Sequence, residues 1–232
     1  MKAIILAAGK GSRLKHYTEN MPKCLLEVNG KKILEYIFEA LIENEITEIV
    51  MVVGYKSFMI KDFIKNHPKF SKLNLTFIEN DEYNNSNTSY SWWLARDFIK
   101  NESQILHLHS DLIYFGDLIK KIVHHKRENI LCIDKKISLD ESMEQVILDE
   151  NEKMVYMDKK MIPNAHGKAV GVAKFSNQAI NSILNGIEER INIGDKNYAL
   201  YGIIRKKIDD VDFYGLDIGD SFFKEVNTFD EY

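Results

Sequence analysis

A glycine-rich run with one arginine follows the first apolar stretch of the sequence, in Leu6-Ala7-Ala8-Gly9-Lys10-Gly11-Ser12-Arg13. Glycines let the backbone turn tightly and bring its N–H groups close to a phosphate. The guanidinium of Arg13 can donate paired, charge-assisted hydrogen bonds to phosphate oxygens. The run lacks the closing Gly-Lys-Ser/Thr of a Walker A loop and the third glycine of a dinucleotide fingerprint. It indicates a phosphate-binding loop, and a ligand-free strand-to-helix turn is the alternative.

A lysine follows this loop at a restricted position. Pro22 fixes the local backbone and so limits where Lys23 points. An ammonium group there would hold the α-phosphate of a nucleotide and neutralise charge that builds up in the transition state. A solvated loop lysine is the alternative, because lysines are mostly exposed.

An aspartate follows a later apolar run, in His109-Ser110-Asp111. Mg²⁺ takes oxygen ligands, usually one or two carboxylates together with substrate phosphates and water. We therefore predict that Asp111 is a magnesium ligand, and the alternative is that it caps the N-terminus of a helix. His107 and His109 are two positions apart on the same predicted strand, so both are expected on one face of it. Since no third ligand has a recognisable spacing, we expect them to be structural.

Apolar runs alternate with amphipathic stretches through the first 135 residues. The strands and helices that they predict must position the candidate side chains Arg13, Lys23 and Asp111. Strands are predicted at 2–7, 47–53, 73–79, 103–109 and 130–134, and helices at 32–45, 57–66, 88–100 and 116–126. Repeated strand–helix–strand units favour a parallel sheet with helices on both faces. Ligands of such sheets gather at the carboxyl ends of the strands, here residues 8–14, 80–90, 110–112 and the segment after 223.

The pattern changes after residue 135. A hairpin is predicted from 144–149 and 153–158, further strands at 168–175 and 211–217, and helices at 177–190 and 197–208. No Pro/Gly/Ser-rich linker divides the chain. We therefore interpret residues 1–232 as a single domain, with a nucleotide-binding half (1–135) and an acceptor-binding half (136–232).

Bulk composition excludes several classes of protein. The 232 residues are 45% hydrophobic and carry a net charge of -4, which gives no electrostatic footprint for nucleic acid. The apolar runs are too short to span a bilayer, so no membrane partner is predicted. Two cysteines without short spacing, Cys24 and Cys132, favour a reducing, cytoplasmic location. The oligomeric state is left open, a homodimer included.

The combination of Gly9-x-Gly11-x-Arg13, Thr18 and Pro22-Lys23 resembles the signature of the sugar-nucleotide and phosphocholine nucleotidyltransferases. The resemblance runs from Met1 to Glu225-Val226-Asn227-Thr228. It implies an α/β fold with a Rossmann-like, three-layer, mostly parallel mixed sheet flanked by helices and a small C-terminal β extension, the nucleotide-diphospho-sugar transferase fold. The short length and the segment 80–94 look most like the CTP:phosphocholine cytidylyltransferase branch.

The resemblance also implies roles for individual residues. The residues expected to be catalytic are Lys23, Arg13 and Asp111. Nucleotide-binding residues are expected to be Leu6, Ala7, Ala8, Gly9, Gly11, Ser12, Arg13, Lys23, Asn87, Thr88 and Ser89. Mg²⁺ is the expected cofactor, held by Asp111, Glu225 and Asn227, and the acceptor is expected to contact Tyr90 and Tyr201.

Two positions depart from the family pattern. Asn227 stands where aspartate is common, and an asparagine offers a carbonyl oxygen without the charge. Ile203 stands where the choline enzymes are expected to have an acidic residue, and it cannot pair with a quaternary ammonium. An acid at Asp195, Asp217 or Glu144 is an alternative partner for an ammonium group, and the sequence does not choose among them.

The resemblance thus implies a Mg²⁺-dependent cytidylyltransferase. It would transfer CMP from CTP to a small phosphorylated acceptor (phosphocholine-like, a phosphonate, or a phospho-amino acid such as phosphoglutamine) and release pyrophosphate, for cell-surface polysaccharide decoration. A sugar-1-phosphate nucleotidyltransferase is one alternative. A non-catalytic nucleotide-binding domain is another, favoured by Asn227 and disfavoured by the joint presence of Gly11, Arg13, Lys23 and Asp111.

Overall fold

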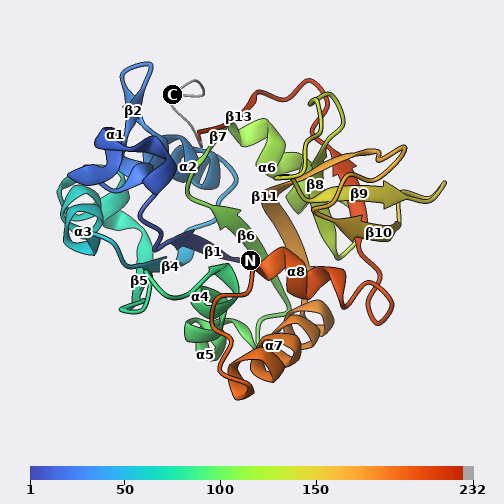
Figure 1. Cartoon of the computed structure of the whole chain (residues 1–232). Helices are drawn as coiled ribbons and strands as arrows, with labels where there is room; N and C mark the ends of the chain where they lie inside the picture. Colours follow the sequence, from blue (N-terminus) through green and yellow to red (C-terminus); the bar gives the residue numbers. More distant parts are fainter. Residues whose placement is uncertain (227–232) are drawn as a thin grey trace.

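One mixed β-sheet runs through both halves of the chain (Figure 1). The computed structural model describes residues 1–226, apart from the side chain of Lys72. The strands of the sheet are β1 (Lys2–Ala7), β4 (Glu48–Val53), β5 (Asn74–Glu79), β6 (Gln104–His109), β8 (Ile130–Asp134), β9 (Gln145–Leu148), β10 (Met154–Asp158), β11 (Gly167–Ser176) and β12 (Tyr214–Asp217). Their order is β10-β9-β11-β6-β1-β4-β5, with β8 beside β11 and β12 beside β8.

The centre of the sheet is parallel and its second half is largely antiparallel. Strands β6, β1, β4 and β5 run parallel, whereas β11 is antiparallel to β6, β8 and β9. The parallel part follows from the strand–helix–strand units of the first half, because a helical crossover returns the chain to the same end of the sheet. The predicted mixed α/β sheet is confirmed. Its parallel strands all end at the edge where residues 8–14, 80–90 and 110–112 lie.

Helices cover both faces of the sheet. The helices are α1 (His16–Glu19), α2 (Ile33–Glu43), α3 (Ser57–Asn66), α4 (Thr88–Leu94), α5 (Arg96–Ile99), α6 (Gly116–Val123), α7 (Asn177–Asn192) and α8 (Leu200–Arg205). Alternate residues of a strand point to opposite faces. In β1, Ile5 and Ala7 join the core under α2, α3 and α6, whereas Ile4 and Leu6 join the core under α4, α5, α7 and α8. This confirms that the first strand is buried on both faces.

Short elements account for most differences from the predicted boundaries. The predicted helix at 88–100 is broken at Ala95 into α4 and α5. Two three-residue strands, β7 (Leu112–Tyr114) and β13 (Phe223–Glu225), pair antiparallel beyond the end of β6. Segments of this length carry too few residues for a periodic pattern. Their pairing is what brings the C-terminal Glu225 beside the segment that follows Asp111.

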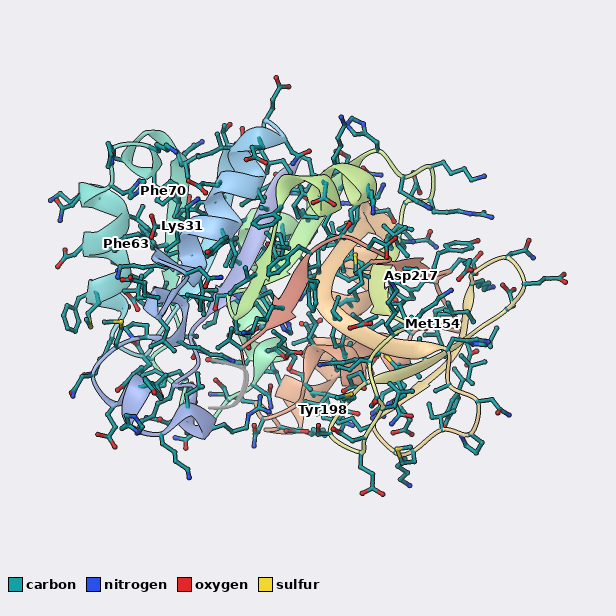
Figure 2. All side chains as sticks on the ribbon, turned by 90° about the horizontal axis from the view of Figure 1, so that it is seen from above. Lys31, Phe63, Phe70, Met154, Tyr198 and Asp217 are labelled. Carbon is teal, nitrogen blue, oxygen red and sulfur yellow. The ribbon has the colours of Figure 1, made fainter. Side chains whose placement is uncertain are left out.

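The remaining elements flank the first half. They are the 3₁₀ turns η1 (Ser12–Leu14), η2 (Lys23–Leu25) and η3 (Phe70–Lys72) and the hairpin strands β2 (Glu27–Val28) and β3 (Lys31–Lys32). Figure 2 shows Phe63 and Phe70 together at the α3 end of the molecule, with Met154 and Asp217 at the opposite end. Among residues 1–226, none of the helices has both the length and the apolar character that crossing a bilayer requires.

Candidate active site

The loop after β1 is held in shape by glycine and threonine. Gly11 has a φ of 66°, in the left-handed region that favours glycine. A Cβ at this position would lie 3.2 Å from Cβ of Lys23 and 3.3 Å from Cγ2 of Thr18. The buried Thr18 hydroxyl donates to the carbonyl of Gly11 at 3.0 Å. Gly11 is therefore closely packed against both of the other motif residues, Thr18 and Lys23.

Gly9 lies in open space in the same loop. A Cβ there would meet no heavy atom within 4 Å. The backbone behind it is fixed, because the N–H of Tyr55 donates to the carbonyl of Ala8 at 3.0 Å. The close packing of the two segments requires glycine at position 54, because a Cβ added there would lie 2.9 Å from the carbonyl oxygen of Ala8. The loop thus exposes its backbone at Gly9 to the cavity in front of it.

Lys23 and Asp111 form an ion pair of 2.8 Å between Nζ and Oδ2. Burial is the largest single effect and disfavours the charged form of Asp111, but the charge and hydrogen bond of Lys23, together with His109 and a backbone hydrogen bond, outweigh it and lower the pKa of Asp111. The second oxygen, Oδ1, is buried without a hydrogen-bond partner among residues 1–226. Asp111 is therefore an ionised carboxylate with one oxygen still available to a ligand.

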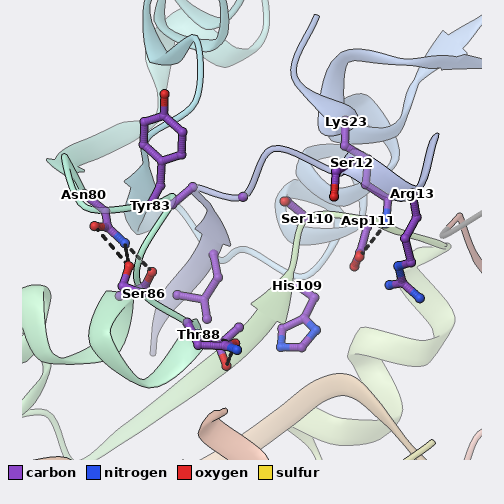
Figure 3. Close-up of a pocket in the computed structure, with 16 residues that line it drawn as sticks. Ser12, Arg13, Lys23, Asn80, Tyr83, Ser86, Thr88, His109, Ser110 and Asp111 are labelled. Atoms are coloured by element: carbon purple, nitrogen blue, oxygen red, sulfur yellow. Dashed lines mark hydrogen bonds and ion pairs between the residues drawn. The ribbon is translucent and has the colours of Figure 1, made fainter. Parts of the chain in front are cut away.

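Two cavities meet at Asp111, and Lys23 lines the first of them. The first, here called the loop cavity, measures about 320 Å³ and lies between the loop after β1 and residues 80–91 (Figure 3). The second, here called the β11 cavity, measures about 310 Å³ and is lined by β11, the N-terminal part of α8 and residues 142–144. Both cavities are lined by Arg13, Asn87, Thr88, His109 and Asp111. The arrangement provides neighbouring spaces for two ligands that meet at Asp111.

Most of the residues predicted to bind the nucleotide line the loop cavity. They are Leu6, Ala8, Gly9, Gly11, Ser12, Arg13, Lys23, Asn87 and Thr88. Figure 3 shows Lys23, Arg13 and Asp111 on one side of this cavity and Asn80 and Tyr83 on the other.

Two predicted nucleotide-binding residues do not line it. The side chain of Ala7 packs into the core under α2, because strand alternation turns it away from its neighbours Leu6 and Ala8. The hydroxyl of Ser89 is occupied as a donor to the carbonyl of Tyr198 at 2.6 Å.

The two tyrosines predicted to contact the acceptor are placed differently. Tyr201 lines the β11 cavity with its ring, and its hydroxyl donates to the carbonyl of Val170. Tyr90 lines neither cavity, so the structure does not support a contact with the acceptor there. Its hydroxyl donates to Glu82 at 3.1 Å. Thr88 and Ser91 are three positions apart on α4 and both line the loop cavity, so they share the face of the helix that points to this cavity. Tyr90 lies on another face of the helix.

The residues predicted to hold Mg²⁺ are only partly described. Glu225 lines the β11 cavity together with Asp111, and its carboxylate is paired with Lys168. Asn227 lies outside the described residues. Within residues 1–226, no three His, Cys, Asp or Glu side chains form a cluster that would hold a metal ion by themselves. Two carboxylates with one unpartnered oxygen do suit Mg²⁺, which completes its shell with substrate phosphates and water.

Three further side chains at the site were not predicted. Asn80 lies in the loop cavity, with its amide donating to the hydroxyls of Ser86 and Ser91. Lys168 lines the β11 cavity from the start of β11, and no motif marks it. The expectation that ligands gather at the carboxyl ends of parallel strands includes residues 80–90, and so Asn80. It gives no signal for Lys168, which lies at the amino end of an antiparallel strand.

His109 is the third. Its ring lies 5.1 Å from that of His107, so the two histidines share a face as predicted. Burial lowers the pKa of His109 and favours the neutral imidazole. Among residues 1–226, Nε2 is buried without a partner in both histidines, but His107 accepts a hydrogen bond from Trp92 at Nδ1 and lines neither cavity, whereas His109 lines both. The sequence predicts a structural histidine at this position, whereas the structure places His109 in the site.

The sequence of this chain is similar to those of curated cytidylyltransferases. The CTP:phosphoglutamine cytidylyltransferase of Campylobacter jejuni is 37% identical over 139 residues, which cover 58% of this chain and 53% of the relative. The choline-phosphate cytidylyltransferase of Streptococcus pneumoniae is 42% identical over 101 residues, which cover 44% of this chain and 42% of the relative. The chain thus spans about half the length of these curated relatives.

Solved structures share the whole fold. The inositol-1-phosphate CTP transferase from T. maritima superposes with a TM-score of 0.81 at 18% identity, covering 100% of this chain and 91% of the other. The CTP:phosphocholine cytidylyltransferase from Streptococcus pneumoniae gives 0.80 at 23% identity, covering 100% and 95%. At these identities the likeness establishes the fold alone, the nucleotide-diphospho-sugar transferase fold. Residues 2–141 of the 232 match the family described as nucleotidyl transferase, and the chain therefore belongs to that family.

Proposed function

We propose that the protein is a Mg²⁺-dependent cytidylyltransferase, which transfers CMP from CTP to a small phosphorylated acceptor and releases pyrophosphate. The observation that carries the proposal is the Lys23–Asp111 pair at the junction of two cavities. A two-substrate phosphoryl transfer needs one space for the nucleotide, one for the acceptor, and preorganised charge where they meet. The names of the relatives in C. jejuni and S. pneumoniae support cytidine as the base.

The loop cavity would hold CTP. Its triphosphate would lie against the loop backbone at Gly9 and against Arg13, which can donate two hydrogen bonds to phosphate oxygens. The nucleoside would lie towards Asn80 and Tyr83 on the opposite side, where hydroxyl groups can hydrogen-bond to a base and a ribose. This arrangement directs the α-phosphate towards Lys23 and Asp111.

The β11 cavity would hold the acceptor, with its phosphate at the shared end. One phosphate oxygen attacks the α-phosphorus in line, a new P–O bond forms, and the bond to the β-phosphate bridging oxygen breaks. Its electron pair leaves with pyrophosphate. Because the attacking oxygen is already anionic, the reaction needs no strong general base. Lys23 neutralises the charge that develops on the α-phosphate, and Arg13 and Lys168 position the two phosphates.

Asp111 and Glu225 would hold Mg²⁺. When bound, the ion would neutralise phosphate charge and, as a Lewis acid, polarise the oxygens of the α-phosphate. In the absence of ligands both carboxylates are neutralised by lysines, Asp111 by Lys23 and Glu225 by Lys168. Each lysine would be released to a phosphate when these carboxylates take the metal.

The test is pyrophosphate release with CTP and Mg²⁺ across a panel of phosphorylated acceptors. The panel contains phosphocholine, phosphoethanolamine, aminoethylphosphonate, phosphoglutamine and a set of sugar 1-phosphates. Release with CTP and one of the small acceptors is the expected result. Release only with a sugar 1-phosphate or another nucleotide would identify a sugar-1-phosphate nucleotidyltransferase. CTP binding without release from any pair would indicate a non-catalytic domain.

A further inference from the structure

The β11 cavity contains a buried carboxylate that the proposed reaction does not use. The side chain of Glu144 is only 9% exposed, and its Oε2 has no hydrogen-bond partner among the described residues. Its nearest cation is the 54% exposed Lys159, whose Nζ lies 3.8 Å from Oε1. That distance is too long for a hydrogen bond. A buried charged group in this condition is costly to the fold unless a ligand supplies the missing donor.

The surroundings of Glu144 offer it no better partner. Arg205 is engaged by Asp158, with 2.6 Å between Nη1 and Oδ1. The backbone of Glu144 is fixed beside β11, because its carbonyl accepts from the N–H of Ala169 at 2.8 Å. Burial accordingly raises the pKa of Glu144, and Lys159 and Arg205 offset this only in part. The carboxylate is held at the cavity wall with the long ion pair to Lys159, and its Oε2 has no hydrogen-bond donor among the described residues.

The two other acids that the sequence offered as ammonium partners lie elsewhere. Asp217 accepts from the N–H of Gly219 at 2.9 Å, and Asp195 accepts from that of Asn197 at 3.1 Å. Neither lines the loop cavity or the β11 cavity. Of the three acids, the structure therefore selects Glu144.

The cavity contains groups of two kinds for an acceptor. Lys168 would bind its phosphate near Asp111, which leaves Glu144 for a group beyond that phosphate. A trimethylammonium group has no N–H and is bound by stacks of aromatic faces. Among the described residues that line this cavity, the only aromatic rings are His109 and Tyr201. Such a lining suits a cation that donates N–H bonds better than one that needs an aromatic cage.

Building on the proposed function, we infer that the acceptor carries a primary ammonium group remote from its phosphate, and that Glu144 binds this ammonium and sets the specificity. The ammonium would donate to the unpartnered Oε2 and neutralise the buried charge. N-Methylation removes the donors, and a hydroxyl in place of the ammonium removes the charge. Both changes should weaken the interaction.

Three acceptors that differ only in this group provide the test: phosphoethanolamine, phosphocholine and 2-hydroxyethyl phosphate. We would measure kcat/KM at saturating CTP, and binding by calorimetry, for the wild type, Glu144→Gln and Glu141→Gln. Glu141 is an exposed acid three positions earlier and serves as the matched control. The wild type should prefer phosphoethanolamine to both analogues by about tenfold or more, the scale of one charged hydrogen bond. Glu144→Gln should lose that preference while binding CTP normally, and Glu141→Gln should retain it.

Equal use of phosphoethanolamine and phosphocholine by the wild type would overturn the inference, even if Glu144→Gln failed to fold. An equal loss in Glu144→Gln for all three acceptors would overturn it as well. Failure of the proposed function has a different signature, namely no pyrophosphate from the wild type with any acceptor. In that case calorimetry decides, because selective, Glu144-dependent binding of phosphoethanolamine would still support the inference and unselective binding would contradict it.

Discussion

Lys23 and Asp111 lie 88 positions apart in the sequence and form a 2.8 Å ion pair between the two cavities. Lys23 follows the phosphate-binding loop, and Asp111 follows the neighbouring parallel strand β6. In this pair each group neutralises the other. With substrates bound, the proposed reaction gives them separate partners, the α-phosphate for Lys23 and Mg²⁺ for Asp111. The ion pair therefore holds the ammonium of Lys23 and the carboxylate of Asp111 at the position where the proposed reaction would use them.

Replacing Lys23 should abolish most of the activity. We expect Lys23→Ala to lower kcat by about two to three orders of magnitude, the scale of losing one preorganised charge contact in the transition state. The measurement is pyrophosphate release at saturating CTP and acceptor. Lys65→Ala, on the exposed face of α3, is the control and should retain full activity. A near-normal kcat in Lys23→Ala would rule out this role for the lysine.

Replacing Asp111 should alter the response to metal. Asp111→Asn keeps the shape but removes the charge, so the Mg²⁺ concentration for half-maximal activity should rise by about tenfold or more. EDTA should abolish the activity of the wild type. Asp117→Asn, at an exposed position where the carboxylate accepts from Ser221, should respond to Mg²⁺ like the wild type. An unchanged Mg²⁺ titration in Asp111→Asn would exclude Asp111 from the metal site.

The two loop glycines should differ in what they contribute. Gly9→Ala meets no atom within 4 Å, so its free energy of unfolding should stay within about 0.5 kcal/mol of the wild type. Its KM for CTP should rise about tenfold, because the methyl group occupies the space where a phosphate approaches the backbone. Gly11→Ala should instead be destabilised by about 1–3 kcal/mol, since its φ is 66°. Unfolding curves and CTP titrations distinguish the two, and normal CTP binding by Gly9→Ala would contradict the placement of the triphosphate.

Gly171 should be required for the position of His109. A Cβ at Gly171 would lie 2.4 Å from the His109 ring, so Gly171→Ala must displace that ring. We expect a loss of about 1–3 kcal/mol in unfolding free energy and weaker binding of both substrates. The double variant Gly171→Ala/His109→Ala should recover most of the stability without the activity, which a double-mutant cycle would measure. If the double variant is no more stable than Gly171→Ala, the clash is not with His109.

The sequence predicts the sheet and the loop side of the site better than the acceptor side. The motif around Gly11, Thr18 and Lys23 is local, and the structure brings these residues into contact. Asp111 is predictable because parallel strands place their carboxyl ends together. Lys168 and Glu144 belong to antiparallel strands and a turn of the second half, where which residues meet depends on register. Strand pairing of this kind leaves no motif in a single sequence.

The buried charge of Glu144 should be visible in the stability of the ligand-free protein. Burial raises its pKa above the ordinary 4.5, although the positive charges of Lys159 and Arg205 oppose this and Asp158 adds to it. As pH rises from 4.5 through the folded-state pKa, the folded protein holds more protons than the unfolded chain, so this group lowers stability. Glu144→Gln cannot ionise and escapes that loss.

We therefore expect Glu144→Gln to unfold at a higher Tm than the wild type at pH 7.5, by about 2–4 °C for each kcal/mol recovered. The difference should shrink as the pH falls below 4.5, where the glutamate becomes protonated in both states. Glu141→Gln, whose carboxylate is exposed, is the matched control. Phosphoethanolamine should raise the Tm of the wild type more than that of Glu144→Gln. A wild type that gains stability over Glu144→Gln as the pH rises without ligand would mean that Glu144 already has a partner in the folded chain.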